Sequence, residues 1–87
     1  MRIKMANKVT IYTTETCGYG RMLKNFLDDN KISYSEKHVD KDAQAAQEMV
    51  GLSGQMGVPF TVIEDGKGQK RGILGFDVTN LKDALAI

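Results

Sequence analysis

Short blocks of apolar residues along the chain predict a mixture of strands and helices. Four blocks have the β-branched composition or the alternating pattern of strands, and they cover residues 8–13, 32–39, 60–63 and 70–74. Three blocks carry apolar residues at helical spacing, and they cover residues 20–30, 43–50 and 78–87. The predicted order is therefore strand, helix, strand, helix, strand, strand, helix.

The residues between these blocks include start and stop signals for helices. Asp40 or Asp42 can cap the second helix, and Gly51 is suited to end it. Asp77 stands at the start of the third helix, and residues 65–68 (DGKG) are a hairpin turn signal between the last two strands. The first two strands and the helix between them favour parallel pairing with a right-handed crossover. We therefore predict an α/β fold in which a four-stranded mixed sheet is flanked by three helices.

The composition is that of one small globular domain. The 87 residues are enough for a single domain, so we expect it to span residues 1–87, with residues 1–7 as a loose N-terminal extension. Hydrophobic residues make up 41% and charged residues 26%, as in ordinary globular proteins. The net charge of +1 indicates no nucleic-acid partner. No apolar run approaches the roughly 20 residues of a membrane helix, and the basic start lacks the apolar core of a signal peptide.

Cys17 is the only cysteine, and it stands between the first predicted strand and the first predicted helix. A lone cysteine cannot form an internal disulfide, which favours a reducing compartment and predicts a cytoplasmic location. Unpaired N–H groups and the helix dipole would stabilise a thiolate at this position. A lone cysteine is also commonly a small buried apolar residue, although its neighbours Thr16, Gly18 and Tyr19 are typical of a loop. The pattern leaves both interpretations open.

Three further positions allow a structural and a functional interpretation. Pro59 is either an ordinary residue at a strand start or a cis proline that exposes the main chain of Val58. The segment 74–77 (LGFD) is either a turn with a helix cap or an anion-binding helix N-terminus. His38, the only histidine, is more readily a strand-end residue than a partner for Cys17. One cysteine and one histidine do not supply the four ligands of a protein-only zinc site, so no metal site is predicted.

Three stretches together resemble the glutaredoxins, a family of the thioredoxin superfamily. They read VTIYTTETCGYG at residues 9–20, GQMGVPF at 54–60 and GFDVTNL at 75–81, in the order and spacing of that family. The resemblance extends over residues 8–87. It implies a thioredoxin-like fold with the strand order two, one, three, four, and one groove that holds glutathione.

The resemblance also implies roles for individual residues. Cys17 is the nucleophile. The main chain of Val58, next to a cis Pro59, would pair with the cysteinyl part of glutathione like an added strand. Gln55 would reach the glycine carboxylate of glutathione, and Tyr19 would form a wall of the groove.

The remaining implied contacts lie at the start of the third helix and before the cysteine. In the family, the segment that corresponds to Gly75, Phe76 and Asp77 holds the γ-glutamyl end of glutathione, here through the Phe76 N–H and Asp77. Thr14 occupies the position at which many glutaredoxins have a lysine that binds glutathione. One charged contact with glutathione is therefore lost.

The chain departs from the common family pattern around the cysteine. Gly20 replaces the second cysteine of the C-x-x-C motif, Gly18 replaces a common proline, and Gly57 replaces a threonine. The resulting C-G-Y-G motif is similar to the C-G-F-S motif of monothiol glutaredoxins. With one thiol, the chain cannot use an internal disulfide of its own.

Three functions are compatible with this motif. The favoured one is glutathione-linked, monothiol thiol–disulfide exchange at Cys17, which removes glutathione from glutathionylated proteins. The alternative is a homodimeric, glutathione-dependent carrier of a [2Fe–2S] cluster, with Cys17 as a ligand. A third is a C-G-Y-C glutaredoxin that lacks its resolving cysteine. The partners implied for a monomeric enzyme are glutathione, glutathionylated or disulfide-containing proteins, and glutathione reductase or thioredoxin reductase.

Overall fold

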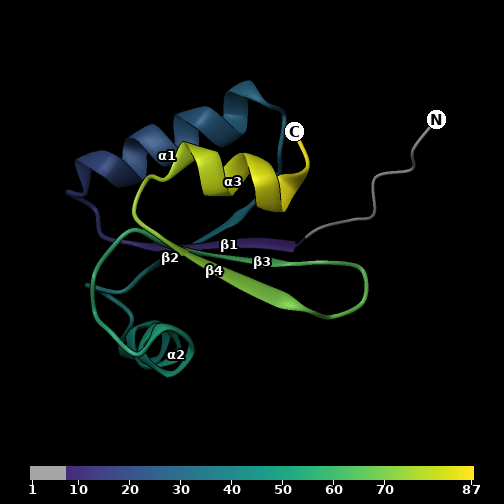
Figure 1. Ribbon diagram of the computed structural model, residues 1–87. Helices are drawn as coiled ribbons and strands as arrows, with labels where there is room; N and C mark the ends of the chain where they lie inside the picture. The colour runs from purple at the N-terminus through teal and green to yellow at the C-terminus, as the bar shows by residue number, and fades with distance from the viewer. Residues whose placement is uncertain (1–7) are drawn as a thin grey trace.

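Four strands and three helices follow one another in the predicted order (Figure 1). The structure is a computed structural model that describes residues 8–87. The elements are β1 (Lys8–Thr13), α1 (Gly18–Asp29), β2 (Ser35–His38), α2 (Ala43–Ser53), β3 (Phe60–Glu64), β4 (Lys70–Leu74) and α3 (Val78–Leu85). The expected extension at residues 1–7 lies outside the described residues.

The four strands form one mixed sheet in the order β2-β1-β3-β4. β1 pairs with β2 in parallel, while β1 with β3 and β3 with β4 are antiparallel. The predicted α/β fold, with a four-stranded mixed sheet and three helices, is confirmed.

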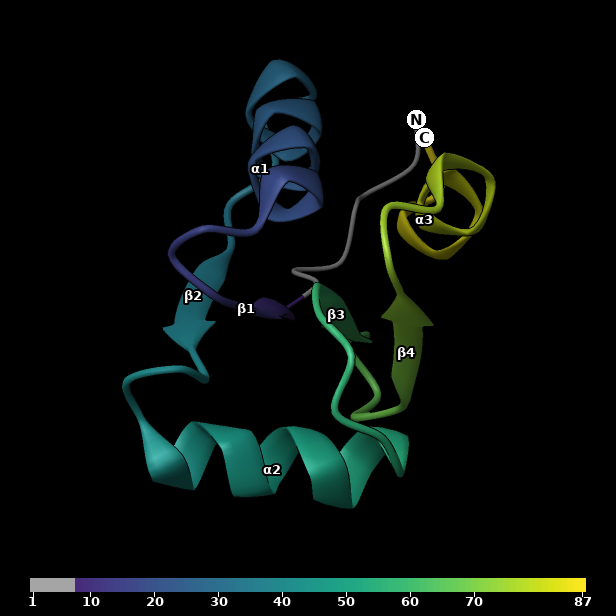
Figure 2. The same cartoon turned by 90° about the vertical axis from the view of Figure 1, so that its left-hand side faces the viewer.

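Each face of the sheet carries its own apolar core. Figures 1 and 2 show α1 and α3 on one face and α2 on the other. Because successive residues of a strand point to opposite faces, Ile11 belongs to the core under α1 and α3, and Tyr12 to the core under α2. The first core contains Val9, Ile11, Leu23, Leu27, Ile63, Ile73, Leu81 and Leu85. The second contains Tyr12, Ala45, Met49, Phe60 and Val62.

The first helix and the second strand have different limits from those predicted. α1 begins at Gly18 rather than at residue 20, because Cys17 is already its N-cap. β2 begins only at Ser35, although the alternating pattern starts at Ile32. Ile32 instead closes the end of α1: Lys31 takes a left-handed φ of 58°, and the Ile32 N–H donates to a carbonyl of the last helical turn at 2.9 Å.

The second helix is longer than predicted. Asp42, and not Asp40, caps α2, and its carboxylate accepts the N–H groups of the first helical turn. Gly51 was predicted to end the helix, but α2 continues to Ser53. Gly54 ends it, because this glycine takes the left-handed φ of 73° that side chains disfavour.

One end of the sheet gathers the segments around the cysteine. β1 and β4 end there and β3 begins there, since β3 is antiparallel to both. Figure 2 faces this end and shows the loop into α1, the start of β3 and the loop into α3 side by side. Among residues 8–87, every helix is too short or too polar to cross a membrane.

Candidate active site

Cys17 is the N-cap residue of α1, and its side chain is half-buried. Its Sγ accepts the main-chain N–H of Gly20 at 3.2 Å. Its own N–H donates to the Thr14 carbonyl at 3.3 Å, which fixes the turn before the helix. The sulfur therefore lies at the N-terminus of a helix and accepts one of its main-chain N–H groups. The side chain is not deeply buried, and its role as a nucleophile stays a prediction.

Gly20 lies directly beside this sulfur. A Cβ atom at this position would lie 3.3 Å from Cys17 Cβ and 3.4 Å from Cys17 Sγ. It would also overlap the hydroxyl oxygen of Thr13, a residue that is only 1% exposed. The Thr13 hydroxyl thus occupies part of the space that a side chain at Gly20 would need.

The loop before Cys17 is held by the loop between β2 and α2. The Glu15 N–H donates to Asp40 at 3.4 Å, and Lys41 Nζ donates to the Glu15 carboxylate at 2.6 Å. The Val39 N–H donates to the Thr13 carbonyl at 2.9 Å. We did not predict any of these contacts, because the partners lie far apart in the sequence and no local motif marks them.

Val58 and Pro59 form the second part of the candidate site. The peptide bond between them is cis, and Pro59 is buried while Val58 is half-buried. Within residues 8–87, neither the N–H nor the carbonyl of Val58 has a hydrogen-bond partner. The main chain of Val58 is therefore free to pair with an extended ligand.

Gln55 folds back onto its own loop. Its Nε2 donates to the Gly57 carbonyl at 3.2 Å and to Ser53 Oγ at 3.1 Å, and its Oε1 accepts the Gly57 N–H. A Cβ atom at Gly57 would lie 2.6 Å from this oxygen, so the glycine at this position makes room for the folded amide. Contact of Gln55 with a ligand would require this amide to turn outwards.

The loop between β4 and α3 forms the third part. Gly75 has a left-handed φ of 78°, and its N–H donates to the Pro59 carbonyl at 2.7 Å, which joins this loop to the second part. Asp77 is the N-cap of α3, as predicted, and its carboxylate accepts the Asn80 N–H at 3.2 Å. Hydrogen bonds from the main-chain N–H and side chain of Asn80 lower the pKa of Asp77 below its ordinary value. Within residues 8–87, the N–H groups of Phe76 and Asp77 have no acceptor.

The other predicted positions lie at the edges of the site. Tyr19 is 64% exposed on the first turn of α1, and Thr14 is half-buried in the loop before Cys17. His38 lies with its Nε2 3.2 Å from Glu36 and makes no hydrogen bond with Cys17. This placement agrees with the interpretation of His38 as a strand-end residue.

The segments that hold the predicted positions thus lie at the end of the sheet where β1 and β4 end and β3 begins (Figure 2). For a [2Fe–2S] cluster, Cys17 would supply one of the four thiolates that such a cluster takes. Residues 8–87 contain no group of three or more acidic, histidine or cysteine side chains that could hold a metal ion. Three thiolates would have to come from outside the chain, and cluster binding stays a prediction.

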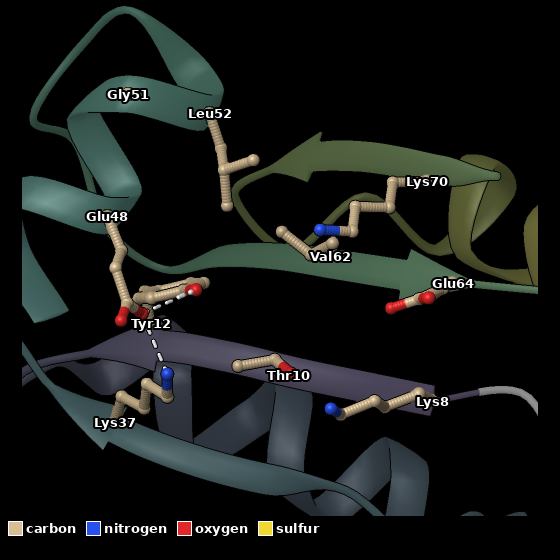
Figure 3. Close-up of a pocket in the computed structure, with 10 residues that line it drawn as sticks. All are labelled: Lys8, Thr10, Tyr12, Lys37, Glu48, Gly51, Leu52, Val62, Glu64 and Lys70. Atoms are coloured by element: carbon tan, nitrogen blue, oxygen red, sulfur yellow. Dashed lines mark hydrogen bonds and ion pairs between the residues drawn. The ribbon is translucent and has the colours of Figure 1, made fainter. Parts of the chain in front are cut away.

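A pocket of about 430 Å³ lies elsewhere, between α2 and the sheet (Figure 3). None of the predicted site residues lines it. Tyr12 O–H and Lys37 Nζ both donate to Glu48, at 3.3 and 2.7 Å, and the Lys37 hydrogen bond lowers the pKa of Glu48. Lys37 and Glu48 thus form an ion pair within the pocket, and its lining contains no cysteine.

Comparisons with known proteins show the family and the fold of the chain. The sequence profile of the glutaredoxin family matches residues 9–68. Glutaredoxin 3 of Escherichia coli K12 is 40% identical over 60 residues, which cover 69% of this chain and 71% of that protein. A putative glutaredoxin of Mycobacterium tuberculosis is 42% identical over 60 residues, or 67% of this chain and 70% of that protein. The crystal structure of the thioredoxin-like protein BC3987 covers 88% of this chain and 99% of its own, with a TM-score of 0.76 and 28% identity.

The chain belongs to the glutaredoxin family. Its fold is thioredoxin-like, with the strand order that the resemblance implied. Glutaredoxins are thiol–disulfide oxidoreductases that use glutathione, so this chain belongs to a family of thiol oxidoreductases. The profile match ends at residue 68, before Gly75, Phe76 and Asp77, and the roles of the individual site residues stay predictions.

Proposed function

We propose that the protein exchanges glutathione between protein thiols and free glutathione through the single thiol of Cys17. The observation that carries this proposal is the hydrogen bond from the Gly20 N–H to Cys17 Sγ at the helix N-terminus. It supports a thiolate nucleophile at Cys17. Since the chain has one cysteine, the cycle must proceed without an internal disulfide.

The free main-chain groups around Cys17 fit an extended glutathione molecule. The N–H and carbonyl of Val58 would pair with the cysteinyl residue of glutathione, as an added strand pairs with a sheet edge. The free N–H groups of Phe76 and Asp77 would donate hydrogen bonds to the γ-glutamyl carboxylate at the start of α3, and the Asp77 carboxylate would hold the ammonium group. Tyr19 would flank the ligand, and Gln55 would turn outwards to reach the glycine carboxylate.

The reaction consists of two thiol–disulfide exchanges. Cys17 thiolate first attacks the glutathione sulfur of a protein–glutathione disulfide; the protein thiolate leaves and takes a proton from solvent. Cys17 then carries glutathione. A second glutathione thiolate attacks that same glutathione sulfur, which releases Cys17 thiolate and oxidised glutathione. In sum, the protein sulfur is reduced and two glutathione sulfurs are joined.

One assay tests this function. Turnover of a glutathionylated protein is followed with glutathione, glutathione reductase and NADPH, and Cys17→Ser is the control. We expect turnover by the wild type and none by Cys17→Ser. Turnover that survives in Cys17→Ser, or no turnover by the wild type, would overturn the proposal. We further infer that the enzyme acts as a monomer in a reducing compartment such as the cytoplasm, where a lone thiol stays free.

A further inference from the structure

Apart from Tyr19, which would flank glutathione, the outer surface of α1 next to Cys17 has no role in the glutathione site described above. An open hollow of about 610 Å³ lies over its first two turns and is lined by Gly18, Tyr19, Arg21, Met22 and Asn25. We name these five residues the α1 surface. The hollow begins at the residue that follows Cys17, so a molecule that reacts with the thiol must lie close to it.

Large apolar side chains are exposed on the α1 surface. Tyr19 is 64% exposed and Met22 is 48% exposed, although the rest of α1 turns Leu23 and Leu27 fully into the core. Aromatic and methionine side chains are enriched at protein interfaces. The α1 surface therefore suits contact with another protein chain.

The charge of the α1 surface is positive and uncompensated. Arg21 is its only charged member, and its guanidinium lies over the first turn, 4.0 Å from the Cβ position of Gly18. Arg21 makes no ion pair with any of residues 8–87, whereas Arg71 pairs with Asp83 at 2.8 Å. A free guanidinium beside exposed apolar groups favours a carboxylate on the partner, which it can hold with two parallel hydrogen bonds.

We propose that the α1 surface selects protein substrates that carry an acidic side chain next to the reacting cysteine. This inference rests on the proposed exchange reaction at Cys17. Tyr19 and Met22 would contact apolar groups of the substrate, and Arg21 would pair with its carboxylate. Glutathione itself would occupy the groove formed by Val58 and the start of α3, so the two parts of a mixed disulfide would have separate contacts.

The test uses three glutathionylated peptides that differ only at the residue before the reacting cysteine, which is Glu, Gln or Lys. Turnover is measured for the wild type, for Arg21→Glu and for Lys67→Glu, a matched charge reversal in the exposed β3–β4 turn. The ratio of kcat/KM between peptides is compared, because this ratio cancels any effect of a substitution on the thiol itself.

We expect the wild type to favour the Glu peptide over the Lys peptide by about threefold to fivefold, as an exposed charge pair allows. Arg21→Glu should reverse the preference, Lys67→Glu should retain it, and added salt should weaken it. Equal turnover of all three peptides by the wild type, or an unchanged preference in Arg21→Glu, would overturn this inference and leave the proposed function intact. No turnover of any peptide, nor of a small glutathione mixed disulfide, would overturn the proposed function and this inference with it.

Discussion

The Thr13 hydroxyl lies in the space that a side chain at Gly20 would need. The effect of Gly20→Ala on the free energy of unfolding should therefore change sign with the residue at position 13. Gly20→Ala has two effects on stability. Alanine in place of a helical glycine stabilises by about 0.5–1 kcal/mol. The added Cβ, however, overlaps the hydroxyl of the buried Thr13, and overpacking of this kind costs about 1–3 kcal/mol. Rotation about the χ1 angle of Thr13 does not relieve this overlap without cost. Because Thr13 is β-branched, the rotation places another heavy atom in a buried position.

In the natural background, we therefore expect Gly20→Ala to destabilise by about 1 kcal/mol. In a Thr13→Ala background the overlap is absent, and Gly20→Ala should stabilise by about 0.5–1 kcal/mol. The coupling between the two positions is then about 2 kcal/mol, well above the error of a double-mutant cycle. Urea denaturation of the four proteins measures it, since about 1 kcal/mol shifts the midpoint of a small protein by up to about 1 M.

Gly51→Ala is the matched control for this cycle. Gly51 also lies in a helix, α2, but a Cβ atom there would contact nothing within 4 Å. It should stabilise by about 0.5–1 kcal/mol whatever residue stands at position 13. If Gly20→Ala stabilises as much as Gly51→Ala while Thr13 is present, the hydroxyl does not occupy the space, and the reasoning is wrong.

Three other substitutions test the fold and the binding groove. Thr61→Val should stabilise by about 1 kcal/mol in urea denaturation, because the Thr61 hydroxyl is buried without a hydrogen-bond partner among residues 8–87; a loss of stability would mean that the hydroxyl has a partner. Thr14→Lys should strengthen glutathione binding about threefold to fivefold in a calorimetric titration by adding one exposed charge contact, and an unchanged affinity would contradict the placement of the groove. Asp77→Asn should keep the cap of α3 but weaken glutathione binding about tenfold. Asp77→Asn should also reduce the loss of protein stability at acid pH. The pKa of Asp77 is lowered in the folded protein, so the stability that its carboxylate contributes is present above its ordinary pKa of 3.8 and is lost as the pH falls through the lower folded value. Equal acid profiles for Asp77→Asn and the wild type would refute this last point.

The fold could be predicted from the sequence wherever local signals were sufficient. β1 and β4 have the predicted limits, and the hairpin turn between β3 and β4 forms around the Asp65 carboxylate. The end of α2 could not be predicted, because Gly51 and Gly54 are both suitable stop signals and only the folded backbone shows which one takes a positive φ. The predicted start of β2 was wrong for a similar reason. Ile32 fits an alternating strand, but its N–H closes the end of α1 instead.

The junction that holds Cys17 could be predicted from the sequence, but the contacts around it could not. The sequence placed Cys17 between a strand and a helix that starts at residue 20, whereas the structure begins the helix at Gly18 and makes Cys17 its N-cap. The overlap of Thr13 with the space at Gly20 depends on the crossing of β1 and α1. The folded amide of Gln55 depends on the missing side chain at Gly57. Such contacts arise from the packing of whole elements, which no short motif records.

The central claim is that Cys17 carries glutathione as the intermediate of a one-thiol cycle. The most direct measurement is the intact mass of the protein after incubation with a glutathionylated substrate and no free glutathione. We predict a gain of one glutathionyl group on Cys17, no gain in Cys17→Ser, and loss of that group as oxidised glutathione once glutathione is added. An unmodified wild-type protein whose Cys17 still reacts with an alkylating agent would contradict the claim.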